Sequence, residues 1–258
     1  MRGFAWSRAS SLVIAVWALA VACQTVPITG RSQLNLVSPA QEIQMGAQAY
    51  QETLKKAKLS TDPSVNALVT RVGRRIAAAT GRTDLPWEFK VIDDPQTVNA
   101  FALPGGKVAV YTGILAMTRD EVGLAAVLGH EVSHVMARHS AERLSDQLVV
   151  QLGVAVLGAA IGASPQTTQA GARILANSIL LPWGRKQESE ADHLGLIYMA
   201  KAGYDPHAAR DLWVRMADAA KGRARQPEFL STHPSEETRV HQIEGWLPEA
   251  MQSYQAPR

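Results

Sequence analysis

The sequence holds little that would indicate a disulfide-linked, membrane-spanning or nucleic-acid-binding protein. Cys23 is the only cysteine, so no disulfide can form within the chain. No apolar run reaches the ~20 residues that a comfortable membrane span needs. Lysine and arginine form no basic stripe, and the formal net charge falls from +3 to +1 (3 − 2) when Arg2 and Arg8 are removed with the N-terminal segment. Nothing therefore favours nucleic acid as a partner.

The remaining composition is that of an ordinary globular protein. The chain has 258 residues, of which 47% are apolar and 19% are charged. These proportions argue against disorder. The length suits one domain, or at most two, with a well-buried core.

The N-terminal residues have the layout of a secretory signal. A short positive head precedes the apolar run Ser11–Ala22, and Cys23 follows directly. The segment resembles a bacterial lipobox, in which the cysteine is lipidated and becomes the new N-terminus, although Ala20 stands where lipoproteins prefer leucine. Gln24, instead of aspartate, favours sorting to the outer membrane. The alternative is ordinary signal cleavage that leaves a free cysteine.

Periodicity in the rest of the chain predicts helices on either side of a few strands. Residues 1–22 are assigned to the signal peptide, 23–40 to a lipidated tether and 41–250 to a single domain. A turn is expected at Pro104–Gly106 and a helix break at 182–184. Strands are expected over 87–91, 99–103 and 107–112, and helices over about 118–143 and 185–202. This order indicates an α+β fold in which helices dominate.

His130, Glu131 and His134 form the motif H-E-x-x-H. On a helix, residues four apart lie on one face, so both imidazoles can bind one zinc ion with Glu131 beside them. The alternative is a surface helix with two solvated histidines. It fits poorly, because the neighbouring residues are mostly apolar and leave little of the helix for solvent. Catalytic zinc also needs a third protein ligand and an open position for water.

The segment from 187 to 193 offers the best third ligand. Glu188 and Asp192 lie one turn apart on one helical face, so Glu188 can bind zinc while Asp192 fixes the tautomer of a ligand histidine. Glu190 faces another direction and is expected to be solvated. His193 lies off the shared face and is expected to pack or to lie at the surface. Both stay open as alternative ligands.

Several motifs together resemble a known family. In order, they are TVPITGRSQLNLV after Cys23, NAFALPGGKVAVYTGIL, LGHEVSHVMARH, ESEADHLGL and STHPSEETR. They span most of the mature chain. The sequence resembles the zinc metallopeptidase family of the CAAX prenyl protease, HtpX and the mitochondrial overlapping-activity protease, and within it the bacterial periplasmic lipoproteins. It lacks the multiple membrane spans of the first two.

The resemblance implies a helix-dominated gluzincin metallopeptidase domain with a small β-sheet or hairpin beside the H-E-x-x-H helix. It implies one Zn²⁺ per chain, held by His130, His134 and Glu188. Glu131 would be the general base, which takes a proton from water and passes it to the leaving amine. Asp192 matches the second acidic residue of the family motif.

Two further features are candidates for substrate handling. His233 is expected to donate a hydrogen bond to the oxyanion, with a loop anchor as the alternative. Asn99, Ala100 and Phe101 are expected to form an edge strand above the zinc, to which a substrate strand could pair. Main-chain pairing is largely blind to side chains, so the expected substrates are extended or unfolded segments.

The sequence thus predicts a zinc-dependent endopeptidase, anchored by lipid on Cys23 in the cell envelope, at the periplasmic face of the outer membrane. It would cleave unfolded or misassembled membrane or periplasmic proteins. The alternatives are a lipid-anchored chaperone or assembly factor and a structural lipoprotein. The apolar segment Leu148–Ala163 is expected to be a buried helix on the active-site helix, with a membrane-surface segment or a lid as alternatives. His139 is expected to be structural.

Overall fold

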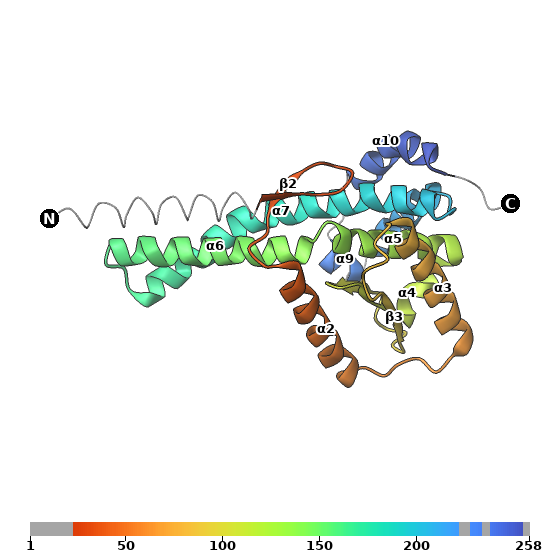
Figure 1. Cartoon of the computed structure of the whole chain (residues 1–258), viewed down its shortest axis with the longest axis horizontal. Helices are drawn as coiled ribbons and strands as arrows, with labels where there is room; N and C mark the ends of the chain where they lie inside the picture. Colours follow the sequence, from red (N-terminus) through yellow and green to blue (C-terminus); the bar gives the residue numbers. More distant parts are fainter. Residues whose placement is uncertain (1–22, 222–227, 234–237, 255–258) are drawn as a thin grey trace. The chain divides into compact units, whose positions relative to one another are not determined.

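The computed structural model describes residues 23–221, 228–233 and 238–254, so the predicted signal segment lies outside the described residues. The chain divides into two compact units (Figure 1). One comprises residues 39–140 and 181–258, and the other comprises residues 1–38 and 141–180. Helix is the main secondary structure of the described chain, as the sequence predicts. The predicted domain limits, 41–250, stay a prediction.

The unit of residues 39–140 and 181–258 is built around a three-stranded sheet in the order β3-β5-β4. β3 (Glu88–Ile92) is parallel to β5 (Lys107–Tyr111), and β4 (Ala100–Leu103) is antiparallel to β5. The turn between β4 and β5 contains Gly105 and Gly106, whose φ angles of 80° and 76° favour glycine. The predicted strands and hairpin are confirmed, and β4 is an edge of this sheet.

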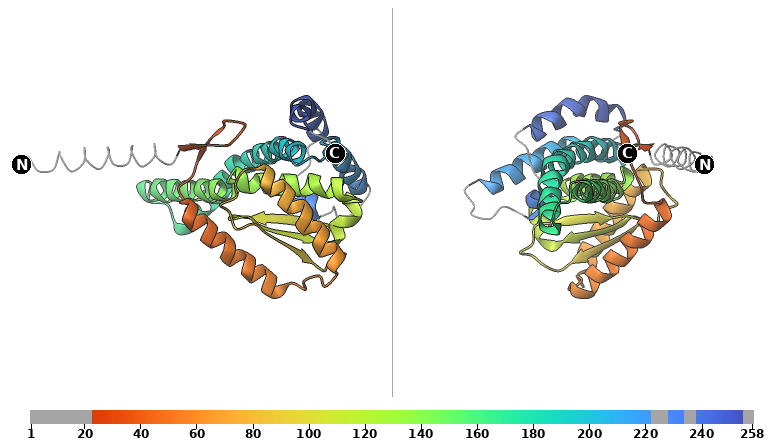
Figure 2. Two further views of the ribbon diagram at one scale, coloured as in Figure 1. Left: turned by 45° about the vertical axis from the view of Figure 1, so that its right-hand side comes forward. Right: turned by 90° about the vertical axis from the view of Figure 1, so that its left-hand side faces the viewer.

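Helices cover both faces of the sheet, which lies between α2 (Pro39–Lys56) and α5 (Glu121–Met136) in Figure 2. Thirteen of the sixteen residues of α5 are buried, so both motif histidines lie inside the protein. The other helices of this unit are α3 (Pro63–Ala79), α4 (Thr112–Thr118), the C-terminal part of α7 (Pro165–Lys201), α8 (His207–Ala220), α9 (Glu228–Thr232) and α10 (Arg239–Gln252).

The helix expected over 118–143 is two helices. Asp120 is the N-cap of α5, because its carboxylate accepts a hydrogen bond from the Gly123 amide at 2.7 Å. α5 ends at Met136, and Arg138 has a φ angle of 54°. A residue in the left-handed region ends a helix, so α6 begins afresh at His139.

The break expected at 182–184 is also absent. α7 continues through these residues as one helix of 37 residues. A proline inside a helix removes one backbone hydrogen bond, crowds the preceding turn and costs about 3 kcal/mol, which the remaining residues of a helix this long can offset. α7 crosses α5 closely, because a Cβ atom on Gly195 would lie only 3.1 Å from the backbone of Gly129 and His130. This contact brings the C-terminal half of α7 to the motif histidines.

The unit of residues 1–38 and 141–180 contains a short hairpin of β1 (Cys23–Thr25) and β2 (Ser32–Leu34). Arg31, in the turn of this hairpin, forms two hydrogen bonds to the Glu142 carboxylate, at 2.5 and 2.8 Å. The segment predicted as a tether therefore has structure of its own.

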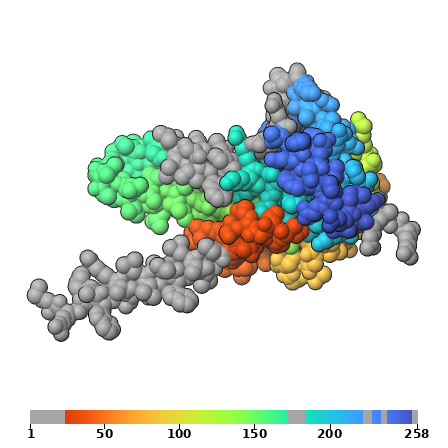
Figure 3. All heavy atoms as spheres, turned by 90° about the horizontal axis from the view of Figure 1, so that it is seen from above, coloured from red at the N-terminus to blue at the C-terminus, as the bar shows by residue number. Residues whose placement is uncertain are grey.

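The second half of α6 (His139–Ala160) and the residue that follows it are largely exposed, as the green surface in Figure 3 shows. Leu152 is 68% exposed and Ile161 is 78% exposed. The expectation of a buried helix at Leu148–Ala163 is therefore wrong, and the membrane-surface and lid alternatives remain. Among the described residues, no helix combines the length and hydropathy needed to cross a membrane.

Candidate metal centre

Three predicted ligands converge in the interior. His130 and His134 lie one turn apart on α5, and their Nε2 atoms are 3.1 Å from each other. Glu188, from α7, places Oε2 3.2 Å from His130 Nε2 and Oε1 3.5 Å from His134 Nε2. All three side chains are buried. The choice of Glu188 over Glu190 and His193 rested on the shared face with Asp192, and the structure brings Glu188 to the histidines.

His233 adds a fourth donor from the chain that follows α9. Its Nδ1 atom lies 2.8 Å from Glu188 Oε2 and 3.1 Å from His130 Nε2. Among the described residues, these four form one group whose ligand atoms all lie within 4.8 Å of each other. From the sequence, His233 was expected only as a hydrogen-bond donor. The motif STHPSEETR indicated that the residue belongs to the site, but spacing alone could not show its distance from the ligands.

The four donors fit zinc. Zn–N bonds of ~2.0–2.1 Å in a tetrahedral arrangement separate two ligand nitrogens by ~3.3 Å, close to the 3.1 Å between the histidine Nε2 atoms. The donor set, three imidazoles and one carboxylate, is one that zinc prefers. Burial acts to lower the pKa of His130, but Asp192 and Glu188 outweigh burial and raise it to about 9. The cluster therefore favours a positive charge at its centre.

Asp192 forms a hydrogen bond with the His130 ring nitrogen that is not among the ligand atoms. Its Oδ1 atom lies 2.8 Å from His130 Nδ1, so the ring donates to the carboxylate from Nδ1 and keeps Nε2 free for a metal. Burial acts to raise the pKa of Asp192, but Arg239 and His130 outweigh burial and hold the pKa below its usual range. This is the role that helix geometry predicts for Asp192.

Arg239 is a site residue that no sequence pattern singled out. Its Nη2 atom donates to Asp192 Oδ1 at 2.7 Å, and its guanidinium lies 3.3 Å from the ring centroid of Trp213. The side chain is almost completely buried. Only its place within STHPSEETR pointed to it, because arginine at the start of a helix carries no pattern of its own.

The two alternative ligands, His193 and Glu190, both have other partners in the structure. His193 stacks on Trp246 and contacts Glu249 at 2.7 Å, so it is a packing residue, as expected. Glu190 was expected to be solvated, and that expectation is wrong. It is buried, and its Oε2 atom lies 3.0 Å from Nε2 of His139. The turn at Arg138 explains the difference, because it places the start of α6 against this side of α7.

Glu131 is 1% exposed and lies beside the ligands. Burial raises the pKa of its carboxyl group, which makes the carboxylate a stronger base than an exposed one. The backbone amide of Ala102, in β4, lies within hydrogen-bonding reach of this carboxylate. The edge strand and the motif glutamate are therefore neighbours.

The register of β4 shows which of its residues face away from β5, toward the outer edge of the sheet. The Tyr111 amide donates to the Asn99 carbonyl, so Asn99 and Phe101 face β5, while Ala100 and Ala102 face the free edge. Ala100 is 1% exposed and its amide donates to Asn99 Oδ1 at 2.9 Å, so the pairing of a substrate strand with Asn99, Ala100 and Phe101 stays a prediction.

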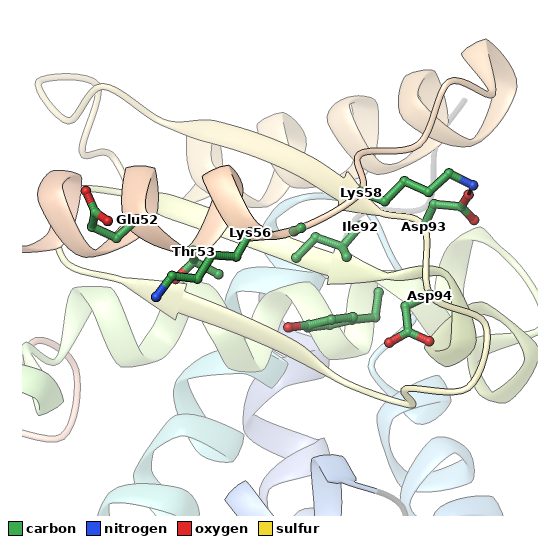
Figure 4. A pocket seen from close by; sticks show the side chains of 9 residues that line it. Glu52, Thr53, Lys56, Lys58, Ile92, Asp93 and Asp94 are labelled. Carbon is green, nitrogen blue, oxygen red and sulfur yellow. Dashed lines mark ion pairs between the residues drawn. The ribbon is translucent and has the colours of Figure 1, made fainter.

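A separate cavity of about 520 Å³ lies at the end of α2, between Glu52 and Lys56 on the helix and Asp93 and Asp94 after β3 (Figure 4). None of the residues that line it belongs to the metal centre. It is therefore not the candidate active site.

Comparison with known proteins agrees with this geometry. Residues 63–247 match the model of peptidase family M48. The chain is 46% identical over 229 residues to the mitochondrial metalloendopeptidase OMA1 of Schizosaccharomyces pombe, an alignment that covers 87% of this chain and 66% of the relative. It is 30% identical over 231 residues to the beta-barrel assembly-enhancing protease of Escherichia coli, which covers 86% of this chain and 47% of the relative.

A third relative is the mitochondrial metalloendopeptidase OMA1 of Homo sapiens, 32% identical over 241 residues, which covers 87% of this chain and 46% of the relative. This chain thus spans two thirds or less of the length of these three proteins. The family match includes the metal-binding residues His130, His134 and Glu188 and also His233. The chain therefore belongs to peptidase family M48 and carries the intact zinc-binding site of a metalloendopeptidase of that family.

Proposed function

We propose that this protein is a zinc-dependent endopeptidase, held in the cell envelope by a lipid on Cys23, that cleaves unfolded or misassembled proteins. The observation that carries the proposal is the position of Glu131, a buried carboxylate beside both the zinc ligands and the free edge of a strand. A site that only binds zinc for structure has no need of a base at this place.

Each residue of the site has a proposed role in peptide hydrolysis. When bound, zinc polarises the substrate carbonyl and lowers the pKa of a water molecule. His130, His134 and Glu188 hold the metal. Glu131 takes the proton of the attacking water and delivers it to the leaving amine.

His233 stays a candidate donor to the oxyanion. Its Nε2 atom lies 3.4 Å from Glu131 Oε1, so the ring is at the reacting atoms. Its Nδ1 atom belongs to the donor group, so His233 would be a fourth protein ligand to a bound zinc ion and would occupy the position that water needs. Hydrolysis would then require the ring to give up this position to water.

The free edge of β4 supports the preference for unfolded chains. A substrate segment in extended form would pair with the outward-facing backbone of Ala100, next to Glu131, in place of the hydrogen bond that the Ala100 amide donates to Asn99 Oδ1. Pairing through the main chain requires that the substrate backbone be unpaired, which excludes folded proteins.

Cys23 and the relatives support a setting in the cell envelope. The lipobox-like sequence before Cys23 supports lipidation at the periplasmic face of the outer membrane. The Escherichia coli relative is named for β-barrel assembly, which supports outer-membrane proteins as substrates. The exposed apolar residues of α6 support contact with a membrane surface.

The test is proteolysis of reduced casein by residues 24–258, which omit the signal segment and Cys23, with added zinc. The matched control is Glu131→Gln, which keeps the size of the side chain and removes the base. We expect cleavage by the native sequence and none by the variant, with equal zinc content in both. Cleavage sites identified by mass spectrometry would then report any side-chain preference.

A lipid-anchored chaperone or assembly factor is the alternative. It would bind unfolded outer-membrane proteins without cleaving them, and Glu131→Gln would leave its function intact. Zinc bound at one ion per chain, with no cleavage by either protein, would contradict the endopeptidase proposal under these conditions. A variant with His233 replaced would then separate a blocked enzyme from a binding protein.

A further inference from the structure

His139 is a fully buried histidine outside the ligand group. It is the first residue of α6, directly after the left-handed Arg138. The Nε atom of Arg138 lies 2.6 Å from Glu42 Oε2, which anchors the turn. The turn directs the His139 ring to the back of His134, where the ring centroids are 4.9 Å apart.

Both ring nitrogens of His139 have a partner. Nδ1 lies 2.8 Å from Nδ1 of His134, and Nε2 lies 3.0 Å from Oε2 of Glu190. Glu190 comes from α7, two residues after the ligand Glu188, and its side chain is buried. The three side chains form a chain of hydrogen bonds that ends on a zinc ligand.

The direction of these hydrogen bonds follows from the carboxylate. An ionised carboxylate only accepts, so His139 donates to Glu190 from Nε2. In a neutral imidazole the other nitrogen is then an acceptor, and His139 Nδ1 accepts from His134 Nδ1. His134 is left with a lone pair on Nε2, the atom that lies 3.1 Å from His130 Nε2 and 3.5 Å from Glu188 Oε1.

We propose that His139 and Glu190 are positioning residues that fix the tautomer and the ring orientation of His134 for zinc binding. Asp192 does the same for His130 through a direct hydrogen bond. The two histidines of the motif are thus supported differently, one by a carboxylate and the other by a carboxylate acting through an imidazole. This role rests on the zinc site of the proposed function.

Simple packing does not account for this arrangement. An aliphatic side chain would fill the space of His139 without the cost of burying two polar nitrogens. A histidine that binds zinc does so as a neutral imidazole through the nitrogen that carries no proton, so the tautomer of His134 has to be chosen. The other tautomer would direct an N–H group at the metal position.

The test measures zinc affinity of the full-length chain by competition with a chelating dye, without substrate. His139→Leu removes the acceptor for His134, whereas His139→Asn keeps an oxygen close to the place of Nδ1. We expect His139→Leu to weaken zinc binding ~10–100-fold, as changes behind a metal ligand do. His139→Asn should recover most of that loss, and Glu190→Gln should lie between. The control is His193→Leu. His193 lies on α7, as Glu190 does, and is also paired with a glutamate, Glu249, so this change should leave the zinc affinity unchanged.

A second readout reports the tautomer itself. In zinc-loaded protein with ¹⁵N-labelled histidine, we expect His134 to carry its proton on Nδ1, and this signal should be lost or split in His139→Leu. Zinc affinity within about twofold of the native value, or an equal loss in His139→Leu and His139→Asn, would overturn the proposal. If His139→Leu does not fold, Glu190→Gln decides, because unchanged affinity and unchanged His134 signals in that variant would also overturn it. Since no substrate is present, a failure of the endopeptidase proposal would leave these results unaffected.

Discussion

At the scale of single residues, the site is a set of metal ligands with a layer of charged groups behind it. Arg239 is the most buried cation of that layer, and it is paired with the carboxylate that holds His130. Removing one member of a buried ion pair leaves the other charged and unpaired, which costs about 3–5 kcal/mol. Arg239→Met should therefore lower the free energy of unfolding by about this amount and weaken zinc binding.

Urea denaturation and dye competition would measure the two effects of Arg239→Met. Arg210→Met is the control, because Arg210 forms exposed ion pairs with Asp211 and Glu244. Exposed pairs contribute about 0–1 kcal/mol. Equal losses of stability in the two variants would show that Arg239 acts only as an ordinary surface charge.

His233 gives the second prediction at this scale. Its Nδ1 atom would be the fourth ligand of a bound zinc ion in place of water, so His233→Ala should keep bound zinc through the other three ligands and should cleave casein faster than the native chain. Zinc content and initial rates at saturating zinc would be measured together. A lower kcat with unchanged zinc content would instead show that the ring acts as the oxyanion donor expected from the sequence.

The residues that could be predicted from the sequence share one property. They form two pairs, each on one helix, in which a spacing of four places both side chains on one face. The pairs are His130 with His134 on α5 and Glu188 with Asp192 on α7. Arg239 and Glu190 could not be predicted in this way. Their partners lie on other elements, and the distance between elements depends on packing that a single sequence does not show.

At the scale of the elements, the crossing of α5 and α7 sets the distance between the H-E-x-x-H motif and Glu188. Gly129 and Gly195 face each other there, and each would place a Cβ atom about 3.0 to 3.1 Å from the other helix. Gly195→Ala should separate the helices and cost about 1–3 kcal/mol, the usual effect of overpacking. It should also weaken zinc binding, since Glu188 moves with α7.

The matched control lies on the same helix. A Cβ atom on Gly184 would meet nothing within 4 Å, so Gly184→Ala should be neutral or slightly stabilising, by up to about 1 kcal/mol. Chemical denaturation and zinc titration of both variants would check the prediction. Similar unfolding energies for the two would mean that the helix crossing adjusts without cost.

The same elements show what periodicity can and cannot predict. The strands were found because alternation and a Pro-Gly-Gly turn are local signals. The end of α5 was missed because Arg138 adopts a left-handed conformation that no local pattern requires. The exposed surface of α6 was missed because apolar composition favours burial, whereas Leu152, Leu157 and Ile161 lie at the surface.

At the scale of the whole molecule, zinc should tie separate parts of the chain together. Its ligands come from α5, from α7 and from the residue after α9. The first and the last of them, His130 and His233, are 103 positions apart in the sequence. Metal binding to the native state stabilises it by mass action, by ~4 kcal/mol when zinc is present at a thousand times its dissociation constant. A chelator should therefore lower the Tm of the native chain.

The size and specificity of that shift can be checked by differential scanning fluorimetry with and without EDTA. Glu188→Ala should melt at a lower temperature than the native chain in zinc and should show a smaller further shift with EDTA, since it removes the only anionic member of the ligand group and leaves three neutral imidazoles. Glu131→Gln, which keeps all four ligands, should respond to EDTA as the native chain does. This pair separates the two functions of the site, because Glu188→Ala weakens metal binding whereas Glu131→Gln loses only the chemistry. An EDTA shift of native size in Glu188→Ala would mean that Glu188 contributes little to the stabilising metal site.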